Sequence, residues 1–366
     1  MPEPTVPDAR GSTASAALHS IEARLIRVPL TRPWAEDIRD VRIIAVTVTT
    51  AEGRQGHGFS WTPVIGSTAV KSLLDDDLAP FLVGRPATPA IWDDAWAHLH
   101  EAGGGGLTTI ALAGVDLALW DLRARDAQTS MTTLLGRRHD RLPVYGSGVN
   151  LHYSTDELVA QASRWVDAGY RAVKIKVGKP DLAEDLERVA AVRSVLGSDR
   201  RLLVDANQRW DLDTATRAVS ALAAHDIGWI EEPLRADDLA GHVELRRRVP
   251  VPIALGENVH TVYRFRDFID AGAVDVIQPN IIRVGGITPF LRIAELARSR
   301  GVELASHLLP ELSAQVAFTL PEQTWIEDVE DAGFAGLGAL TGPSGLDFSD
   351  GWVSGGPALG LGLVFR

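Results

Sequence analysis

The stretch RAVKIKVG, at residues 171–178, places two lysines where a buried strand would carry apolar side chains. The residues alternate with the period of two that is typical of a strand, so Lys174 and Lys176 share one face. The chain has four lysines against 32 arginines, and three of the four lie within 174–179. A partly buried Lys, unlike Arg, can lose its proton. The pair therefore indicates proton chemistry, although two solvated ammonium groups on an exposed sheet edge would give the same pattern.

Three carboxylates, Asp205, Glu231 and Glu257, end consecutive strand-like runs with 26 residues from each to the next. If each repeat is one βα unit of a barrel, all three reach the rim formed by the carboxyl ends of the strands. Carboxylates gathered there without a cation would repel one another. Ligation by carboxylates alone suits Mg²⁺, with Mn²⁺ also possible, and lacks the His and Cys ligands that zinc prefers. Each acidic residue could separately cap a helix, but three in register beside paired lysines favour a metal site.

Two further groups end later strand-like runs. His307 ends the seventh run and Glu327 the eighth, so both belong to the same rim. A lone His at a strand end is commonly structural, held by a hydrogen bond. Barrel geometry, however, places His307 across the mouth from Lys176. A base, a second proton-active group opposite and a cation between them make a proton-transfer site.

The second half of the chain alternates short apolar runs with amphipathic stretches. The runs that read as strands are 142–147, 171–177, 201–206, 228–231, 252–257, 274–279, 302–307 and 324–327. Amphipathic helical stretches such as 155–169 lie between most of them. This alternation predicts an α/β fold with a parallel (β/α)₈ TIM-like barrel rather than a doubly wound sheet.

The region before the barrel reads as strands at 20–31 and 41–60, the second broken by a hairpin turn, followed by helices from 70 to 135. The stretch 110–128 is apolar enough to form a buried helix. We therefore expect four segments. These are a disordered lead-in at 1–17, an N-terminal α+β capping domain at 18–138, a barrel at 139–335 and a C-terminal segment at 336–366 that packs back on the capping domain.

Composition excludes several classes of protein. A hydrophobic fraction of 45% with 23% charged residues is typical of a globular protein. The net charge of −12 argues against a nucleic-acid partner, and no run reaches the length of a membrane span. The absence of Cys fits a cytoplasmic protein. We expect a small-molecule carboxylate as substrate, no nucleic-acid or membrane partner, and association into a homo-oligomer.

Several motifs together resemble those of the enolase superfamily, in its mandelate racemase/muconate lactonizing enzyme family and specifically the mandelate racemase-like branch. The motifs are KIK at 174–176, VDAN at 204–207, WIEEP at 229–233, LGEN at 255–258, RVGGIT at 283–288 and SHL at 306–308. The likeness covers about residues 20–340. It implies an enolase-type modified barrel with a capping domain completed by the C-terminal tail. That branch includes many acid-sugar dehydratases, and the superfamily uses a Lys or His base with Mg²⁺.

The resemblance also implies roles for individual residues. Asp205, Glu231 and Glu257 would bind Mg²⁺, and Lys176 would be the base. Lys174 would hold the substrate carboxylate and depress the pKa of Lys176. Ser147 and Glu327 would flank the carboxylate, with Glu327 as a protonated donor. Mg²⁺ and Lys174 would then lie where negative charge develops once the proton α to the carboxylate is removed.

One position departs from the pattern that the resemblance implies. Relatives with a His base usually have Asp at the end of the sixth strand, and the lactonising and epimerising branch has Lys, whereas this chain has Asn280. An amide can orient His307 but cannot stabilise an imidazolium as a carboxylate does. This favours Lys176 as the base and His307 as the acid, which suits a dehydratase or cycloisomerase better than a racemase.

Substrate contacts are expected from loops that close over the barrel. Trp34, Glu36, Asp37 and Trp61 are candidates from the first domain, and Asn207 and His152 from the barrel. The favoured activity is a Mg²⁺-dependent lyase, a hydro-lyase that dehydrates an acid sugar to a 2-keto-3-deoxy acid. A racemase, epimerase or cycloisomerase that uses the same enediolate is the first alternative. A non-catalytic barrel that binds metal or a sugar acid is the second.

Overall fold

The structure, a computed structural model, describes residues 16–366 except Glu36. Most of the expected lead-in at 1–17, and the candidate Glu36, therefore lie outside the described residues. The last two residues of the expected lead-in, Ala16 and Ala17, are described. The carbonyl oxygen of Ala16 accepts a 2.8 Å hydrogen bond from the N–H of Ala87, and Ala17 forms a β-bridge with Pro86.

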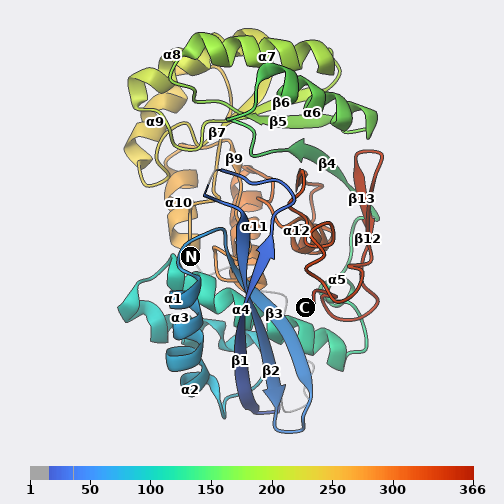
Figure 1. Cartoon of the computed structure of the whole chain (residues 1–366). Coiled ribbons are helices and arrows are strands. Elements are labelled where there is room, and N and C mark those ends of the chain that lie inside the picture. Colours follow the sequence, from blue (N-terminus) through green and yellow to red (C-terminus); the bar gives the residue numbers. More distant parts are fainter. Residues whose placement is uncertain (1–15, 36) are drawn as a thin grey trace.

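The N-terminal domain is a three-stranded antiparallel sheet covered by helices (Figure 1). Its strands, in the order β1-β2-β3, are β1 (Leu18–Pro29), β2 (Asp40–Thr50) and β3 (Gln55–Thr62). Its α-helices are α1 (Ser67–Ser72), α2 (Ala79–Leu82), α3 (Trp92–Leu99), α4 (Leu107–Asp126) and α5 (Met131–Leu135). Sixteen residues of α4 are buried, so the expected buried helix is confirmed. Gly58 lets α4 approach the sheet, because a Cβ there would lie 2.3 Å from the Gly114 carbonyl oxygen.

The second domain is a closed barrel of eight strands. In chain order these are β4 (Arg141–Ser147), β5 (Ala172–Lys176), β6 (Arg201–Asp205), β7 (Ile227–Glu231), β8 (Ile253–Leu255), β9 (Val276–Ile277), β10 (Glu303–Leu304) and β11 (Ile326–Val329). Each strand from β4 to β9 pairs in parallel with the next one along the chain. The barrel closes because β11 pairs in parallel with β4 and is bridged to Ser306 just after β10. The expected fold class is confirmed.

Helices fill the outside of the barrel between consecutive strands. They are α6 (Thr155–Asp167), α7 (Leu182–Leu196), α8 (Leu212–Leu222), α9 (Leu239–Arg248), α10 (Val262–Asp270), α11 (Ile287–Arg300) and α12 (Pro310–Ala317). In the described stretch 330–366 no helix follows β11. The hairpin of β12 (Leu346–Ser349) and β13 (Trp352–Gly355) takes its place and pairs antiparallel with β4.

The end of the chain connects the hairpin to the capping domain. The ring of Phe365 packs edge-on against Phe59 of β3. Arg24 of β1 donates a 2.7 Å hydrogen bond to the carbonyl oxygen of Arg366. The last residues thus lie on the capping domain, while β12 and β13 extend the barrel sheet.

The RVGGIT motif at 283–288 joins the two domains at the start of α11. Thr288 donates from its backbone N–H and its hydroxyl to the buried carboxylate of Asp116 on α4, at 3.0 and 2.5 Å. Trp92 donates from its indole to the carbonyl oxygen of Gly285. Gly286 is required there, since a Cβ would lie 2.3 Å from the Asp116 carboxylate. These contacts join the two domains, and the β1–β2 loop of the capping domain lies beside the mouth of the barrel (Figure 1).

Candidate active site

The chemical groups predicted on three strands lie side by side at one rim of the barrel. Lys176 of β5 is in register with Asp205 of β6, and Asp205 is in register with Glu231 of β7. Parallel neighbours in register bring these side chains to the same level at the carboxyl ends of the strands.

Lys174 is fully buried between two carboxylates. Its ammonium lies 2.7 Å from a carboxylate oxygen of Glu231 and 2.7 Å from one of Glu327. Burial acts to lower the pKa of Lys174, but the two carboxylates outweigh burial and raise it well above its usual range. Lys174 is therefore a fixed positive charge.

Glu327 is a carboxylate and not the protonated donor that we expected. Burial alone would raise its pKa, but the nearby positive charge of Lys174 lowers the pKa to about 2. Both of its oxygens accept: one pairs with Lys174, and the other takes a 2.8 Å hydrogen bond from the N–H of Leu308. The expectation was wrong because the sequence does not reveal that Lys174 reaches across the barrel to β11.

Lys176 lines the cavity at the mouth of the barrel and forms an ion pair with Asp205. The side chain of Asn150 fixes its backbone by accepting from its N–H at 2.9 Å, and buried Arg188 donates to the Asn150 and Lys176 carbonyl oxygens. Burial acts to lower the pKa of Lys176, and so does the charge of Lys174, as the resemblance implied. The Asp205 carboxylate opposes them, and the pKa of Lys176 is raised overall. The expected net depression is therefore not found.

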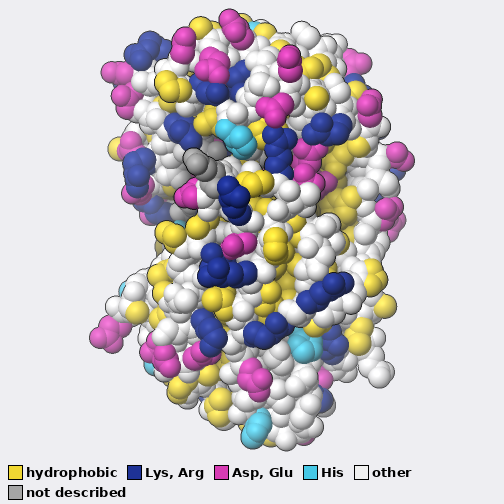
Figure 2. Space-filling view, in the orientation of Figure 1, with side chains coloured by type: hydrophobic (Ala, Val, Ile, Leu, Met, Phe, Trp, Pro, Cys, Tyr) yellow, Lys and Arg dark blue, Asp and Glu magenta, His cyan; other side chains and the backbone are white. Residues whose placement is uncertain are grey.

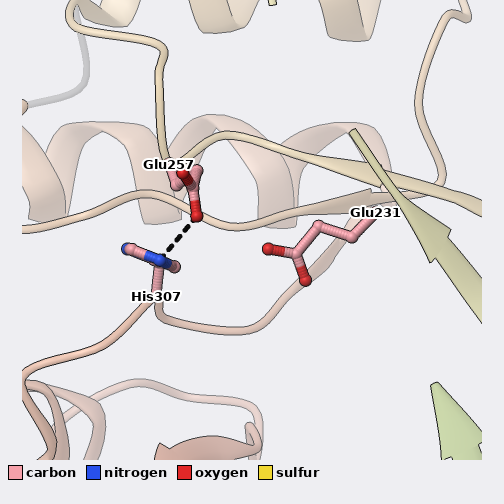
Figure 3. A group of neighbouring side chains, drawn as sticks. All are labelled: Glu231, Glu257 and His307. Atoms are coloured by element: carbon pink, nitrogen blue, oxygen red, sulfur yellow. Dashed lines mark ion pairs between the residues drawn. The ribbon is translucent and has the colours of Figure 1, made fainter. Parts of the chain in front are cut away.

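Glu231, Glu257 and His307 converge, with one candidate ligand atom from each lying within 4.8 Å of the others (Figure 3). The Oε1 atom of Glu231 is buried without a hydrogen-bond partner among the described residues. Burial and the charge of Asp205 raise the pKa of Glu231 to about 7. An unpartnered carboxylate oxygen among like charges fits a divalent cation. Of the three predicted ligands, Glu231 and Glu257 belong to this group, and Asp205 adjoins it through its register with Glu231.

Sequence reasoning missed several residues that support this group. Glu232 is buried next to Glu231 and accepts from Asn258 at 2.9 Å and from Gln208 at 3.0 Å. Gln278 donates to Glu231 at 2.8 Å. The motif WIEEP contained the signal for Glu232, and Gln278 stands at a strand end like the predicted ligands.

Asn280 fixes the orientation of His307. Its side-chain oxygen accepts from the backbone N–H groups of Ile282 and Arg283 at 3.0 and 3.1 Å. Its NH₂ group must therefore face Nδ1 of His307, 3.0 Å away, and Nδ1 must accept. The neutral imidazole consequently carries its proton on Nε2, which lies 2.6 Å from Glu257.

The mouth of the barrel is a cavity of about 770 Å³ between the β1–β2 loop and the strand ends. Three predicted substrate contacts, Trp34, His152 and Asn207, line it together with Lys176. Trp61 does not, because the end of β3 is covered on both faces and Trp61 is buried in the core. Ser147 is buried at the end of β4.

Comparison with known proteins assigns the chain. Residues 20–136 match the mandelate racemase/muconate lactonizing enzyme N-terminal domain, and residues 157–366 match the enolase C-terminal domain-like family. The chain belongs to the mandelate racemase/muconate lactonizing enzyme family of the enolase superfamily. The resemblance seen in the sequence motifs is thereby confirmed.

Relatives within this family differ in the reaction that their names describe. The chain is 38% identical over 316 residues to the 3,6-anhydro-alpha-L-galactonate cycloisomerase of Streptomyces coelicolor, covering 85% of this chain and 88% of that one. A racemase from Streptomyces coelicolor with bound magnesium superposes with a TM-score of 0.89 at 36% identity, covering 95% and 97%. The L-talarate dehydratase of a Polaromonas species, complexed with Mg and L-glucarate, superposes with a TM-score of 0.87 at 35% identity, covering 96% of each chain.

The chain is therefore an enzyme of the enolase superfamily, and its expected metal, Mg²⁺, is the metal bound in both of those homologous structures. One of these family members binds a sugar acid together with Mg. Among the described helices, none combines the length and the apolar character that crossing a bilayer requires.

Proposed function

We propose that this enzyme eliminates an oxygen substituent β to the carboxylate of an acid sugar, most simply as water. Once its ammonium has released a proton, the amine of Lys176 takes the proton from C2, the C3–O bond breaks, and the departing oxygen takes a proton. The enol that remains becomes a 2-keto-3-deoxy acid. Asp205, Glu231 and Glu257 would hold Mg²⁺, which stabilises negative charge on the substrate carboxylate when it is bound.

The contact between Asn280 and His307 is the observation that supports elimination over racemisation. A racemase needs a proton acceptor on each face of C2. Asn280 makes Nδ1 an acceptor and leaves the proton on Nε2, so His307 faces the site as a donor. An imidazolium would place an N–H at Nδ1 against the NH₂ of Asn280. His307 therefore suits the departing oxygen, and Lys176 is left as the one base.

Lys174 provides the fixed charge for this chemistry. Removal of the C2 proton concentrates negative charge on the carboxylate oxygens of the substrate. A buried ammonium held by Glu231 and Glu327 cannot reorganise, so it stabilises that charge as it develops. Lys174 thus favours the transition state over the ground state.

A cycloisomerase that opens a 3,6-anhydro bridge is the second candidate. In such a substrate the oxygen on C3 belongs to a ring ether, so the same cleavage of the C3–O bond isomerises the acid without loss of water. The 38% identity to an anhydro-galactonate cycloisomerase supports this version. Lys176 and His307 would have the same roles in it.

The test is a panel of acid sugars and 3,6-anhydro acids incubated in D₂O with Mg²⁺. Formation of 2-keto-3-deoxy acid from a 3-hydroxy acid identifies a dehydratase, and formation from an anhydro acid identifies a cycloisomerase. Deuterium at C2 of an otherwise unchanged or epimerised acid would contradict elimination and favour a racemase. The absence of any turnover or exchange across the panel would favour a binding protein without catalysis.

A further inference from the structure

The mouth of the barrel is strongly basic in a protein whose net charge is −12. The cationic side chains that line it are Arg32, Arg39, Lys176, Lys179 and Arg209. No acidic side chain is among its described lining residues. Figure 2 shows Lys and Arg side chains gathered on this face, where the β1–β2 loop meets the barrel. Positive charges concentrated in a cleft attract anions. The positive charge here is more than is needed to bind one substrate carboxylate at the floor of the cavity.

Most of these cations already have acidic partners. Lys176 pairs with Asp205, and Lys179 lies 2.6 Å from Glu184. Arg32 lies 3.0 Å from Glu157, which is mostly exposed. These pairs reduce the charge that each cation offers to a ligand.

Arg209 differs from them because its guanidinium has no acidic partner within the described part of the chain. It lies in the loop between β6 and α8, four residues after Asp205, and its side chain lines the mouth. Its stem passes directly over Gly178, where a Cβ would lie 2.6 Å from the Cδ atom of Arg209. Gly178 has a φ of +103°, so that position both needs glycine and leaves space for the arginine.

We propose that the substrate is a dicarboxylic acid sugar whose second carboxylate binds Arg209. This inference rests on the proposed function. The reacting carboxylate lies at the inner end near Lys174 and Lys176, and the sugar chain extends outward along the cavity. An unpaired guanidinium at the outer end binds a carboxylate through two parallel hydrogen bonds. A monoacid sugar ends in a neutral hydroxyl and leaves Arg209 without a ligand.

The experiment compares matched pairs of acids that differ only at the far terminus. Aldarates and the corresponding aldonates are assayed with the wild type, with Arg209→Gln and with Arg217→Gln. Arg217 is an exposed arginine of α8 that does not line the mouth, so it is the matched control. We expect the wild type to prefer the aldarate, and Arg209→Gln to lower kcat/KM for the aldarate about 10- to 100-fold, chiefly through KM. Arg217→Gln should leave kcat/KM unchanged for both acids, and Arg209→Gln should lower kcat/KM for the aldonate far less than for the aldarate.

A second part of the experiment tests whether Arg209 binds a carboxylate or a phosphate at the far terminus of the substrate. An aldonate phosphorylated at the far terminus is added to the panel, and preference for it over the aldarate overturns the assignment of a dicarboxylic acid. Equal use of aldarate and aldonate, or equal losses in Arg209→Gln and Arg217→Gln, also overturns it.

Binding distinguishes failure of this inference from failure of the proposed function. Calorimetric titration of D-glucarate and D-gluconate into Lys176→Met, with Mg²⁺ present, requires no turnover. Tighter binding of glucarate that is lost in Lys176→Met/Arg209→Gln supports the second-carboxylate site even if the proposed reaction is wrong. Equal affinities for the two acids overturn the site, whatever reaction the wild type catalyses.

Discussion

The side-chain amide of Asn280 donates to Nδ1 of His307 across 3.0 Å, and two backbone N–H groups prevent the amide from turning over. A carboxylate at this position would accept a hydrogen bond from an N–H at Nδ1 and leave Nε2 free to accept a proton. The identity of one atom at residue 280 therefore determines whether Nε2 of the imidazole is a hydrogen-bond donor or an acceptor.

Replacing Asn280 with Asp should give the enzyme a second base. In Asn280→Asp we expect the tautomer of His307 to change, deuterium to enter C2 of recovered substrate, and elimination to slow by at least about tenfold. Nitrogen NMR of the imidazole reports the tautomer, and proton NMR reports exchange at C2. An unchanged tautomer in Asn280→Asp would contradict the hydrogen-bond assignment.

Loss of Lys176 should abolish proton removal. We expect Lys176→Ala to lower kcat by about 10²- to 10⁴-fold, because a positioned base contributes that much. Lys71→Ala is the control. Lys71 is a surface lysine of α1, and it pairs with Asp75 in the helical segment that follows α1. Circular dichroism should show both variants folded. Near-wild-type turnover by Lys176→Ala would rule out this residue as the base.

Metal binding should stabilise the fold because it relieves repulsion among buried carboxylates. At a Mg²⁺ concentration one hundred times Kd, the free energy of unfolding should increase by about 2.7 kcal/mol and the Tm by about 3 to 4 °C. Chelation should reverse the change, and Glu257→Gln should reduce it. A scan of Tm against Mg²⁺ with each variant measures the effect. The same Tm increase in Glu231→Gln/Glu257→Gln would place the ion elsewhere.

The two glycines at the ends of α11 should differ sharply in their tolerance of a side chain. Gly286→Ala puts a Cβ 2.3 Å from the Asp116 carboxylate at a φ of +113°, so we expect a loss of about 3 kcal/mol or more. Gly301→Ala, at a φ of +67° in open space, should cost only about 1 kcal/mol. Urea unfolding measures both. Equal losses would show that contact with Asp116 does not determine the cost.

Asp116 should make stability fall as pH rises. Burial raises its pKa to about 7, against 3.8 for the free side chain, despite two hydrogen bonds from Thr288. The folded state therefore keeps a proton that the unfolded state releases. The destabilisation is absent below about pH 4, grows by up to about 1.4 kcal/mol per pH unit, and is complete above about pH 7.

Comparison with Asp116→Asn isolates this effect from other titrations. The difference in unfolding free energy between wild type and variant, measured by urea at several pH values, should change between pH 4 and 7 and be constant above. A flat difference across that range would show that Asp116 is ionised throughout in the folded protein.

Local patterns predicted the barrel and the rim because both repeat along the chain. The period of two at 171–177 and the 26-residue interval from Asp205 to Glu231 to Glu257 specify strands and a shared edge. The repeat predicts the final strand at 324–327, whereas β11 spans Ile326–Val329, because its pairing with β4 joins the two ends of the barrel sequence.

Contacts between distant segments were not predictable in the same way. Nothing near Glu327 in sequence shows that Lys174 neutralises it, and nothing near Trp61 shows that the core covers it. Asn150, Glu232 and Arg209 lack a repeat or a spacing that would mark them.

The sequence by itself determined the family, the order of strands and which side chains reach the catalytic rim, because these follow from periodicity and motif. Only the tertiary structure decided which of those side chains are charged and which nitrogen of His307 carries the proton. It also decided which arginine of the mouth has no acidic partner among residues 16–35 and 37–366. Those properties depend on burial and on atoms that folding brings within a few ångströms from remote parts of the chain.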